Sequence, residues 1–436
     1  MFPRPLPATI SWSFLGVLLT LVSSPTLAIE GEALTFLEVP PVETDNRIDD
    51  FFENHLVARG ESLNLRERLF VFLPGSFGRP DGNRLLLREA ALVGYHVIGL
   101  RYPNRWTVGG LCGNNANRRC FDQVRSEILS GRDRSNLVDV SRINSVENRL
   151  EKLLEYLDRE FPQGGWGQYL TADGAVEWTR TVMAGHSQGG GHAALWGRDK
   201  LLAGVLMFGA PVDFSRRYER VAQWPRDSRR TPASRYFGFA HEDDNRERML
   251  AVWRALEVDA FGEVVTVDSI SAPYEGSHLL STRAEPALPN RQHGSVAVDA
   301  AVPLDSQGEP LFRPVWQHLL NSVGQGVPLG SLADRFEVTA AWRRPNGSFG
   351  AGVGVPLSAD SGYFWFFRPE NVELVIKVLD GCSVTGSFWV LAGGLTNVEV
   401  EILIRDLETG LQTIYRNPPQ TPFQPIQDTT AFHSCF

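Results

Sequence analysis

The sequence predicts a doubly wound α/β fold with a mostly parallel sheet, followed by an all-β, sandwich-like region. Between residues 69 and 320, short apolar runs alternate with longer segments whose apolar residues recur at helical spacing. Such alternation is typical of β–α–β units, in which helices cover both faces of a parallel sheet. After residue 327 the helical spacing stops and short alternating or aromatic runs follow. That second pattern predicts a β-rich domain of roughly 100 residues.

The elements of the first region follow one another along the chain. A strand is expected wherever a short apolar run is bounded by Gly, Pro or acidic residues, and a helix wherever apolar residues form one face. The expected strands are 68–75, 95–100, 181–187, 203–211, 235–244 and 277–282, and the expected helices are 83–94, 143–161, the segment from 189, and 313–323. The β-rich runs are 327–342, 362–367, 372–379, 387–395, 398–406 and 412–417.

The first 28 residues have the composition of a secretory signal peptide. Arg4 precedes an apolar stretch from Ile10 to Val22, and Thr26 and Ala28 occupy the small-residue positions of a cleavage site. The apolar stretch is shorter than the roughly 20 residues that a membrane-spanning helix needs. We therefore expect a secreted or periplasmic protein without a membrane span after cleavage. The expected domains are 29–326 and 327–436.

Charge and cysteine content narrow the class further. The formal net charge is −9 and no long basic tract is present, so nothing points to nucleic-acid binding. The four cysteines lack C-x-x-C spacing, which favours disulfides over metal binding in an oxidising compartment. We expect a Cys112–Cys120 bridge across a polar loop and, by elimination, a Cys382–Cys435 bridge.

The stretch TVMAGHSQGGGHAALWG (181–197) contains the pattern G-x-S-x-G as Gly185-His186-Ser187-Gln188-Gly189. A strand is expected before it and a helix after it, which is the context of a nucleophile elbow. A serine on that turn needs glycines on both sides, because a Cβ there would collide with neighbouring backbone. The alternative is a tight turn with no chemical role.

With this motif, residues from about 36 to 322 resemble the α/β-hydrolase fold family, and in particular secreted bacterial members of it. The resemblance implies a serine nucleophile, an acid and a histidine in that chain order. It also implies an oxyanion hole built from two backbone N–H groups, and chemistry that needs no cofactor. No dinucleotide fingerprint, P-loop or H-E-x-x-H motif is present in the sequence, so no cofactor or metal is expected.

The resemblance places the acid after the strand at 235–244, in FGFAHEDD. Asp243 is the expected member, with Asp244 and Glu242 as close alternatives. The base is expected in the loop after the last strand, which favours His293 over His278. His186, His192 and His241 are weaker candidates, because each lies beside the motif, on the following helix or before the acids. A solvated acidic turn is the alternative for the carboxylate cluster.

The oxyanion hole should combine the N–H of Gln188 with one from the loop FLPGSFGRP (72–80). Ser76 or Phe77 would supply that second N–H, and Gly75 would let the backbone approach. A plain turn is the alternative reading of this loop.

Three further segments bear on ligands. Tyr102 and Trp106 follow a strand at the expected active-site edge, where they either line a pocket or pack in a surface loop. The arginine-rich segment 215–235 falls where lids insert in this family, and it either attracts an acidic substrate or forms a solvated face. The aromatic residues of the β-rich domain either bind a polymer or fill its core, with the core favoured; they are Tyr363, Phe364, Trp365, Phe366, Phe367 and Trp389.

These observations predict a secreted serine hydrolase that cleaves a small-molecule or polymeric carboxylic ester through an acyl-enzyme. Amide hydrolysis and acyl transfer are possible on the same scaffold. A catalytically silent hydrolase fold that binds through its β-rich domain is the alternative from another class. The sequence indicates no ligand for that domain.

Overall fold

The computed structural model describes residues 34, 36–59, 68–323, 329–333, 335–345, 349–368 and 371–435. The predicted signal peptide, residues 1–28, lies outside these residues. So does the predicted domain boundary at residues 326 and 327.

Across these ranges, none of the helices combines the length and the apolar character that crossing a membrane would require.

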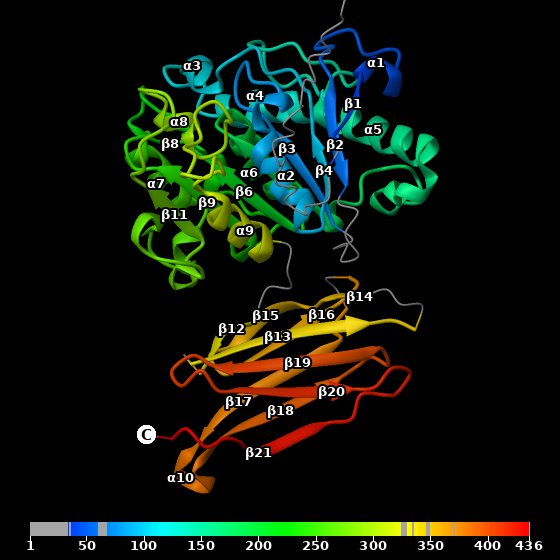
Figure 1. Ribbon diagram of the computed structural model, residues 1–436, viewed down its shortest axis with the longest axis vertical. Coiled ribbons are helices and arrows are strands. Elements are labelled where there is room, and N and C mark those ends of the chain that lie inside the picture. Colours follow the sequence, from blue (N-terminus) through cyan, green and yellow to red (C-terminus); the bar gives the residue numbers. More distant parts are fainter. Residues whose placement is uncertain are drawn as a thin grey trace, which may run out of the picture. The chain divides into compact units, whose positions relative to one another are not determined.

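A large, mostly parallel sheet forms the centre of the first region (Figure 1). Every neighbouring pair from β4 to β10 runs parallel, whereas β2 is antiparallel to both β1 and β4. In spatial order the strands are β1 (Leu37–Val39), β2 (His55–Arg59), β4 (His96–Gly99), β3 (Leu69–Leu73), β5 (Thr181–His186), β6 (Gly204–Phe208), β9 (Tyr236–His241), β11 (Leu279–Thr282) and β10 (Val265–Thr266). The predicted parallel sheet is thus confirmed.

The central strands are apolar throughout because both of their faces are covered. In β3, all five residues are buried, and successive side chains enter different cores. Leu69 and Val71 join one cluster, whereas Phe70 and Phe72 join the other. Such two-sided burial explains why these strands read as continuous apolar runs rather than as alternating ones.

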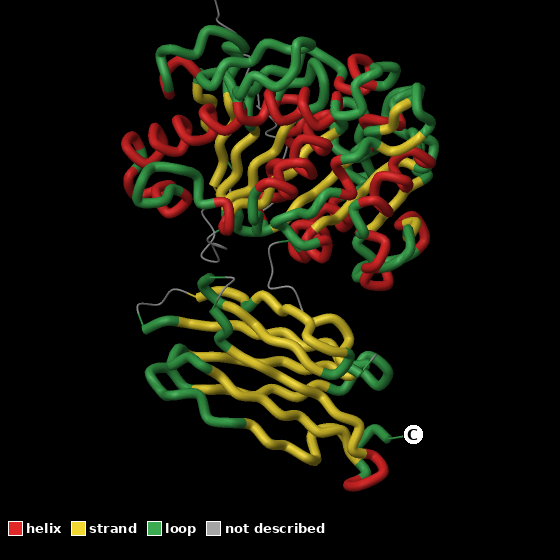
Figure 2. The backbone as a smooth tube through the Cα atoms, turned by 180° about the vertical axis from the view of Figure 1, so that it is seen from behind, coloured by secondary structure: helices red, strands yellow, loops and turns green. Residues whose placement is uncertain are grey.

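Helices cover both faces of this sheet, as expected for a doubly wound fold. On one face, α2 (Arg84–Leu92) packs beside α9 (Arg313–Ser322). The other face carries α4 (Cys120–Ser130), α5 (Val146–Glu160), α6 (Gln188–Asp199) and α7 (Arg246–Ala255). The first pair is seen in Figure 1 and the second group from behind in Figure 2.

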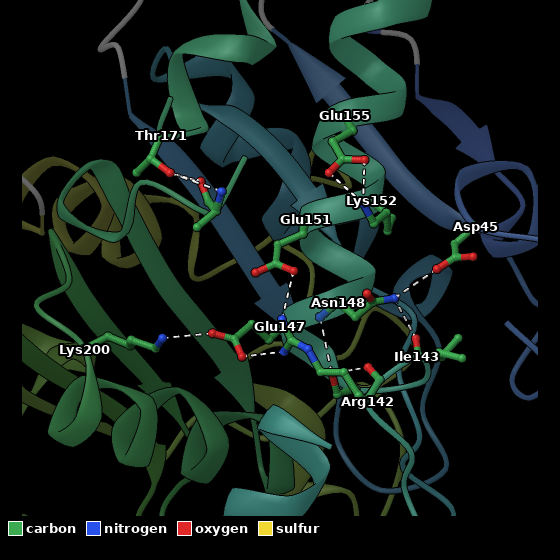
Figure 3. Close-up of polar contacts among 12 residues, drawn as sticks. Asp45, Arg142, Ile143, Glu147, Asn148, Glu151, Lys152, Glu155, Thr171 and Lys200 are labelled. Atoms are coloured by element: carbon green, nitrogen blue, oxygen red, sulfur yellow. Dashed lines mark hydrogen bonds and ion pairs between the residues drawn. The ribbon is translucent and has the colours of Figure 1, made fainter. Parts of the chain in front are cut away.

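Helix α5 begins later than the apolar pattern alone predicts, because a cap fixes its start. The Ser145 hydroxyl accepts a hydrogen bond from the Asn148 N–H at 3.2 Å, which satisfies one free donor of the first turn. Arg142, just outside the helix, pairs with Glu147, and Lys200 at the end of α6 pairs with the same carboxylate (Figure 3). These ion pairs tie the start of α5 to the end of α6.

The second region consists of two antiparallel sheets (Figure 2). One contains β12 (Leu329–Leu332), β13 (Phe336–Arg343), β19 (Glu399–Asp406) and β20 (Gln412–Asn417), with β14 (Phe349–Ala351) paired to β13. The other contains β15 (Val353–Ser358), β16 (Ser361–Trp365), β17 (Leu374–Gly381), β18 (Ser387–Gly394) and β21 (Ile426–Phe432). Alternate residues of both sheets fill one shared cluster, which is the packing of a β-sandwich.

Three of the six aromatic residues singled out in this region contribute to that cluster, and Trp365 is buried outside it. Phe364 and Phe366 are buried members of it, and Phe367 packs against its edge. Tyr363 and Trp389 are half-buried.

Both predicted disulfides are present. Cys112–Cys120 joins α3 (Val108–Cys112) to the start of α4, and Cys382–Cys435 joins α10 (Cys382–Thr385) to the last residues of the described chain. They close loops with sequence separations of 8 and 53 residues.

Candidate active site

Ser187, Asp244 and His293 lie together at one edge of the large sheet. Ser187 follows β5, Asp244 follows β9, and His293 lies in the short helix α8 (Gln292–Ser295) after β11. Because β5, β6, β9 and β11 are parallel neighbours, their carboxyl ends meet at the same edge. Residues far apart in sequence are therefore brought within hydrogen-bond distance.

The turn at Ser187 has the geometry of a nucleophile elbow. Its backbone has φ 55° and ψ −117°, a conformation that costs a non-glycine residue about 1–3 kcal/mol. A Cβ at Gly185 would stand 2.3 Å from the carbonyl carbon of Gly189, and one at Gly189 would stand 1.9 Å from the Leu73 carbonyl oxygen. The Ser187 N–H donates to the Phe208 carbonyl at 2.9 Å, which ties the turn to β6. Only glycine fits two residues before and two residues after this serine.

A chain of two hydrogen bonds connects the three side chains. His293 Nδ1–H donates to Asp244 Oδ2 at 2.6 Å, and the Ser187 hydroxyl donates to His293 Nε2 at 2.7 Å. The proton stands on Nδ1 because a carboxylate can only accept, which leaves Nε2 free to accept from the serine. The Asp244 side chain is 4% exposed and that of His293 is 41% exposed, so the acid is enclosed while the imidazole faces the solvent.

Asp243, the acid favoured by the sequence, does not reach His293. Its side chain is exposed, and its backbone N–H donates to His241 Nδ1 at 3.1 Å. The chain turns immediately after β9, with the Asp244 N–H bonded to the His241 carbonyl, and this turn sends the second carboxylate inward. Glu242 lies toward β10 and β11, where burial opposes ionisation but hydrogen bonds from Thr266, Arg283 and Ser281 lower its pKa to about 2.

His278 is also not brought to Ser187. It immediately precedes β11 and so lies at the amino end of the parallel strands, the edge opposite to the serine. Its ring stacks between Phe237 and Phe261, with centroid distances of 3.9 and 4.9 Å. Burial lowers the pKa of His278 to about 4. This histidine is part of the packing.

His186, beside Ser187, supports the position of His293. Its Nε2–H donates to the backbone carbonyl of His293 at 2.7 Å. Burial, reinforced by the nearby His293, lowers the pKa of His186 to about 4. The ring is therefore neutral near pH 7 and acts as a hydrogen-bond donor between β5 and α8. Of the other candidates, His192 is buried against Tyr102, and His241 lies under the acidic turn.

One of the two loop donors expected for the oxyanion hole is already used. The Phe77 N–H donates to the Asn104 carbonyl at 2.9 Å and is thus directed away from Ser187. Within the described ranges, neither the Ser76 N–H nor the Gln188 N–H has a hydrogen-bond partner. The Ser76 hydroxyl donates to Gln188 Oε1 at 3.0 Å, which holds the loop beside the start of α6. Of the two expected loop donors, Ser76 remains the candidate.

Asn104 fixes this loop and was missed by the sequence analysis. Its amide Nδ2 donates to the carbonyls of Gly75 and Gly78 at 2.7 and 2.8 Å, and its side chain is fully buried. Tyr102, for which the sequence left pocket lining and loop packing open, is buried and donates to the Pro74 carbonyl at 2.7 Å. Together the two side chains fix the loop at residues 74–78 through hydrogen bonds to its backbone carbonyls.

A buried ion pair beneath the elbow was also missed. Arg125 on α4 donates to both carboxylate oxygens of Asp213 at 2.8 and 2.6 Å, and both side chains are almost fully enclosed. A further Arg125 N–H donates to the Gln188 carbonyl at 2.9 Å. The signal in the sequence is an arginine at helical spacing with Phe121 and Ile128, because a charge on an apolar helix face needs a partner.

These groups surround a cleft of about 540 Å³. Ser187, His293 and the 75–79 loop form part of its wall, together with Val108, Val212 and Val298. Trp106, for which the sequence left the same two alternatives open, is not among the residues that line this cleft in the described chain. Within the same ranges, no group of three or more His, Cys, Asp and Glu side chains is arranged to hold a metal ion.

No protein-family model and no curated protein matches the sequence. Among solved structures, the protein TT1662 from Thermus thermophilus is 13% identical, with 57% of this chain and 87% of that chain covered and a TM-score of 0.29. An α/β serine hydrolase homologue from Coxiella burnetii is 12% identical, with 53% and 82% covered and a TM-score of 0.28.

Similarity at this level adds nothing to the fold assignment, which depends on the strand order. The order β1-β2-β4-β3-β5-β6-β9-β11, with only β2 reversed, is that of the α/β-hydrolase sheet. The serine lies on the turn between the strand at the centre of that sheet and the helix that follows. Residues 37–322 have the α/β-hydrolase fold.

Proposed function

We propose that this protein is a serine hydrolase that cleaves carboxylic esters through an acyl-enzyme. The observation that carries the proposal is the hydrogen-bonded chain from Ser187 through His293 to Asp244, which opens into a cleft. A serine hydroxyl is a weak nucleophile unless a base takes its proton, and an imidazole serves as that base when a carboxylate holds its tautomer.

In the first half of the reaction, Ser187 Oγ attacks the acyl carbon and its proton passes to His293 Nε2. Asp244, which accepts from Nδ1–H at 2.6 Å, stabilises the imidazolium that results. His293 then returns the proton to the leaving alcohol as the carbon–oxygen bond breaks. In the second half, water attacks the acyl-enzyme with His293 again as base, which releases the acid and restores Ser187.

The negative oxygen of each tetrahedral intermediate needs hydrogen-bond donors that are not already used. The Gln188 and Ser76 N–H groups meet that requirement, and the amino end of α6 adds a favourable dipole. Each such donor contributes about 3 kcal/mol to lowering the barrier.

The first test is hydrolysis of p-nitrophenyl acetate, butyrate and palmitate by the wild type, Ser187→Ala and His293→Ala. Activity should fall at least about 1,000-fold in both variants. His278→Asn is the matched histidine control and should keep at least about half of the wild-type rate, because this side chain lies at the opposite edge of the sheet. Circular dichroism spectra should show that all variants fold.

Labelling with a fluorophosphonate separates this proposal from the silent-scaffold alternative. Wild-type protein should be labelled at Ser187 and the Ser187→Ala variant should not be. A wild type that neither reacts with the probe nor hydrolyses any of the three esters would contradict the proposal. Cleavage of the matching anilides in preference to the esters would make the protein an amidase on the same site.

We further propose that the protein is exported, that residues 29–326 form the catalytic domain, and that residues 327–436 form an accessory domain. The two disulfides support export, since such bonds persist in oxidising compartments. The separate cluster of apolar residues in the two antiparallel sheets supports the division into domains.

A further inference from the structure

A second hollow, of about 350 Å³, adjoins the catalytic cleft and is lined by arginines. Arg118, Arg220 and Arg226 contribute to its wall, together with Asn117 and Tyr218. No carboxylate belongs to its lining in the described part of the chain. The strand pair β7 (Phe214–Ser215) and β8 (Arg220–Val221) forms one side, and the loop closed by Cys112–Cys120 forms the other.

The charges of this hollow are not neutralised by the protein. Within the described ranges, Arg118, Arg220 and Arg226 form no ion pair, whereas the neighbouring Asp122 and Asp227 are engaged by Arg198. Segment 215–235 has seven arginines against two carboxylates, a net charge of +5 in a chain whose net charge is −9. An arginine carries five N–H donors, so most of the hydrogen-bonding capacity of these three side chains is free.

The hollow is held in shape by contacts between its two sides. The Tyr218 hydroxyl donates to the Ala116 carbonyl at 2.7 Å, and the Arg217 N–H donates to the Gly113 carbonyl at 3.1 Å. The guanidinium groups of Arg118 and Arg220 lie 4.9 and 5.7 Å from the centre of the Tyr218 ring. Stacking of this kind fixes the direction of the remaining N–H donors.

Three chain segments connect this hollow to the cleft over a short distance. In α3, Val108 lines the cleft and Cys112 lines the hollow, which is about 6 Å along a helix axis. In α4, Arg125 and Phe121 line the cleft and the hollow, about 6 Å apart by the same rise. Along the β7 segment, Asp213 lines the cleft and Ser215 lines the hollow, about 7 Å apart. The hollow and the cleft are therefore close neighbours, formed at successive positions of the same three segments.

We propose that this hollow is a subsite for an oxyanion group, such as a carboxylate, sulfate or phosphate. The ester substrate would bear this group at a distance from the bond that is cleaved. The proposal rests on the proposed hydrolase function and adds the substrate class. Several guanidinium groups bind an oxyanion through charge-assisted hydrogen bonds, which are stronger than bonds between neutral groups. A neutral ester of the same length would leave these donors to water.

The test compares p-nitrophenyl esters of a monocarboxylic acid and of the dicarboxylic acid of equal chain length, which differ only in a terminal carboxylate. The wild type should prefer the anionic ester in kcat/KM, mainly through KM. In Arg118→Gln and Arg220→Gln, the ratio of kcat/KM for the anionic over the neutral ester should fall about 10-fold. Arg230→Gln removes the same charge from an exposed side chain of the same segment outside the hollow, and should keep the wild-type ratio.

A binding measurement separates failure of this proposal from failure of the proposed function. Calorimetric titration of Ser187→Ala with the free dicarboxylate should show binding that Arg118→Gln and Arg220→Gln weaken and Arg230→Gln does not. That result stands even if the wild type hydrolyses no ester. Equal kcat/KM for the two esters, or a preference that survives both arginine substitutions, would overturn the subsite. Binding of inorganic phosphate at the arginines without any preference between the esters would overturn its role in substrate recognition.

Discussion

Asp243 and Asp244 are adjacent carboxylates that the turn after β9 sends to opposite environments. Asp244 is enclosed and accepts a hydrogen bond from His293. Asp243 is exposed, and its backbone N–H donates to His241 Nδ1. A shift of one position along the turn thus decides whether a carboxylate points inward or into solvent. At this scale, geometry and not residue type decides which carboxylate reaches His293.

We expect Asp244→Asn to lower kcat by roughly 1,000- to 10,000-fold on p-nitrophenyl butyrate. An amide at this position no longer holds the proton on His293 Nδ1, so Nε2 ceases to be a base for Ser187. Asp243→Asn makes the same chemical change one residue away and should alter kcat by no more than about twofold. Steady-state rates measured side by side decide between them, and a large loss in Asp243→Asn alone would restore that residue as the acid.

At the residue scale, the sequence could predict the tight turn at Ser187, because the glycines around it meet the steric requirement of that turn. His293 could be placed after the last strand through the family resemblance. The sequence could not predict which carboxylate bonds to His293 or which loop N–H stays without a partner, because each depends on the direction of a single residue in a turn. Phe77 and Ser76 differ only in which N–H points to Asn104, and no local pattern encodes that direction.

Among the elements, α3 and α4 connect the outer loops to the elbow. The Cys112–Cys120 bridge joins these two helices, Val108 at the start of α3 donates to the Gln188 side chain, and Arg125 on α4 donates to the Gln188 backbone. Helix α4 was not predicted, because the polar loop that contains the two cysteines precedes it directly. The apolar face of α4 nevertheless has helical spacing. Short strands such as β2 were missed for a related reason, since a run of five residues carries little periodicity.

Removing each disulfide should therefore have a different consequence. Cys112→Ser/Cys120→Ser should lower the free energy of unfolding by about 2.5 kcal/mol and also raise KM, because α3 and α4 lose their covalent link. Cys382→Ser/Cys435→Ser opens a longer loop and should cost about 4 kcal/mol, with kcat/KM for p-nitrophenyl butyrate unaltered. Urea unfolding and ester hydrolysis on both double variants check this; equal effects on KM would contradict it.

On the scale of the whole molecule, the large sheet buries several neutral histidines. Burial is the main cause in each case: it lowers the pKa of His96, His186 and His278 to about 4, and it holds those of His55 and His192 well below the usual value. As pH falls from 6.5 toward 4, the unfolded chain takes up protons at these positions that the folded chain does not. The resulting stability is present above pH 6.5 and is lost through this window.

We expect the urea midpoint of the catalytic region to fall steeply between pH 6.5 and 4.5, since each such histidine contributes about 1.4 kcal/mol per pH unit. Asp299, whose pKa burial raises to about 6, acts in the opposite direction and offsets part of the slope. His278→Asn should lower by about one the number of protons taken up on unfolding in this pH range. The asparagine amide keeps a hydrogen-bond donor toward the Tyr236 carbonyl. Equilibrium unfolding at several pH values measures the slope; a slope equal to that of the wild type in this variant would contradict the account.

For the whole molecule, the alternation of strands and helices was enough to predict a parallel sheet covered on both faces. The spatial order of the strands is not encoded locally and was not predicted. The β-sandwich could be predicted because its strands alternate, with residues such as Val338 and Ile402 facing the shared core. Which sheet each strand joins follows from long-range pairing, for example β13 with β19, and that information is not in any one segment.

The glycines of the elbow also limit how this protein can change over evolutionary time. A Cβ at Gly185, Gly189, Gly190 or Gly191 would lie 2.3, 1.9, 2.6 and 2.3 Å from its nearest neighbour, and that neighbour is backbone in the first two cases. A single substitution at any of these positions requires a compensating shift at the start of α6, in β3, in Ala210 or in Arg125. Change at residues 185 and 189–191 over evolutionary time therefore needs a second change in a neighbouring residue.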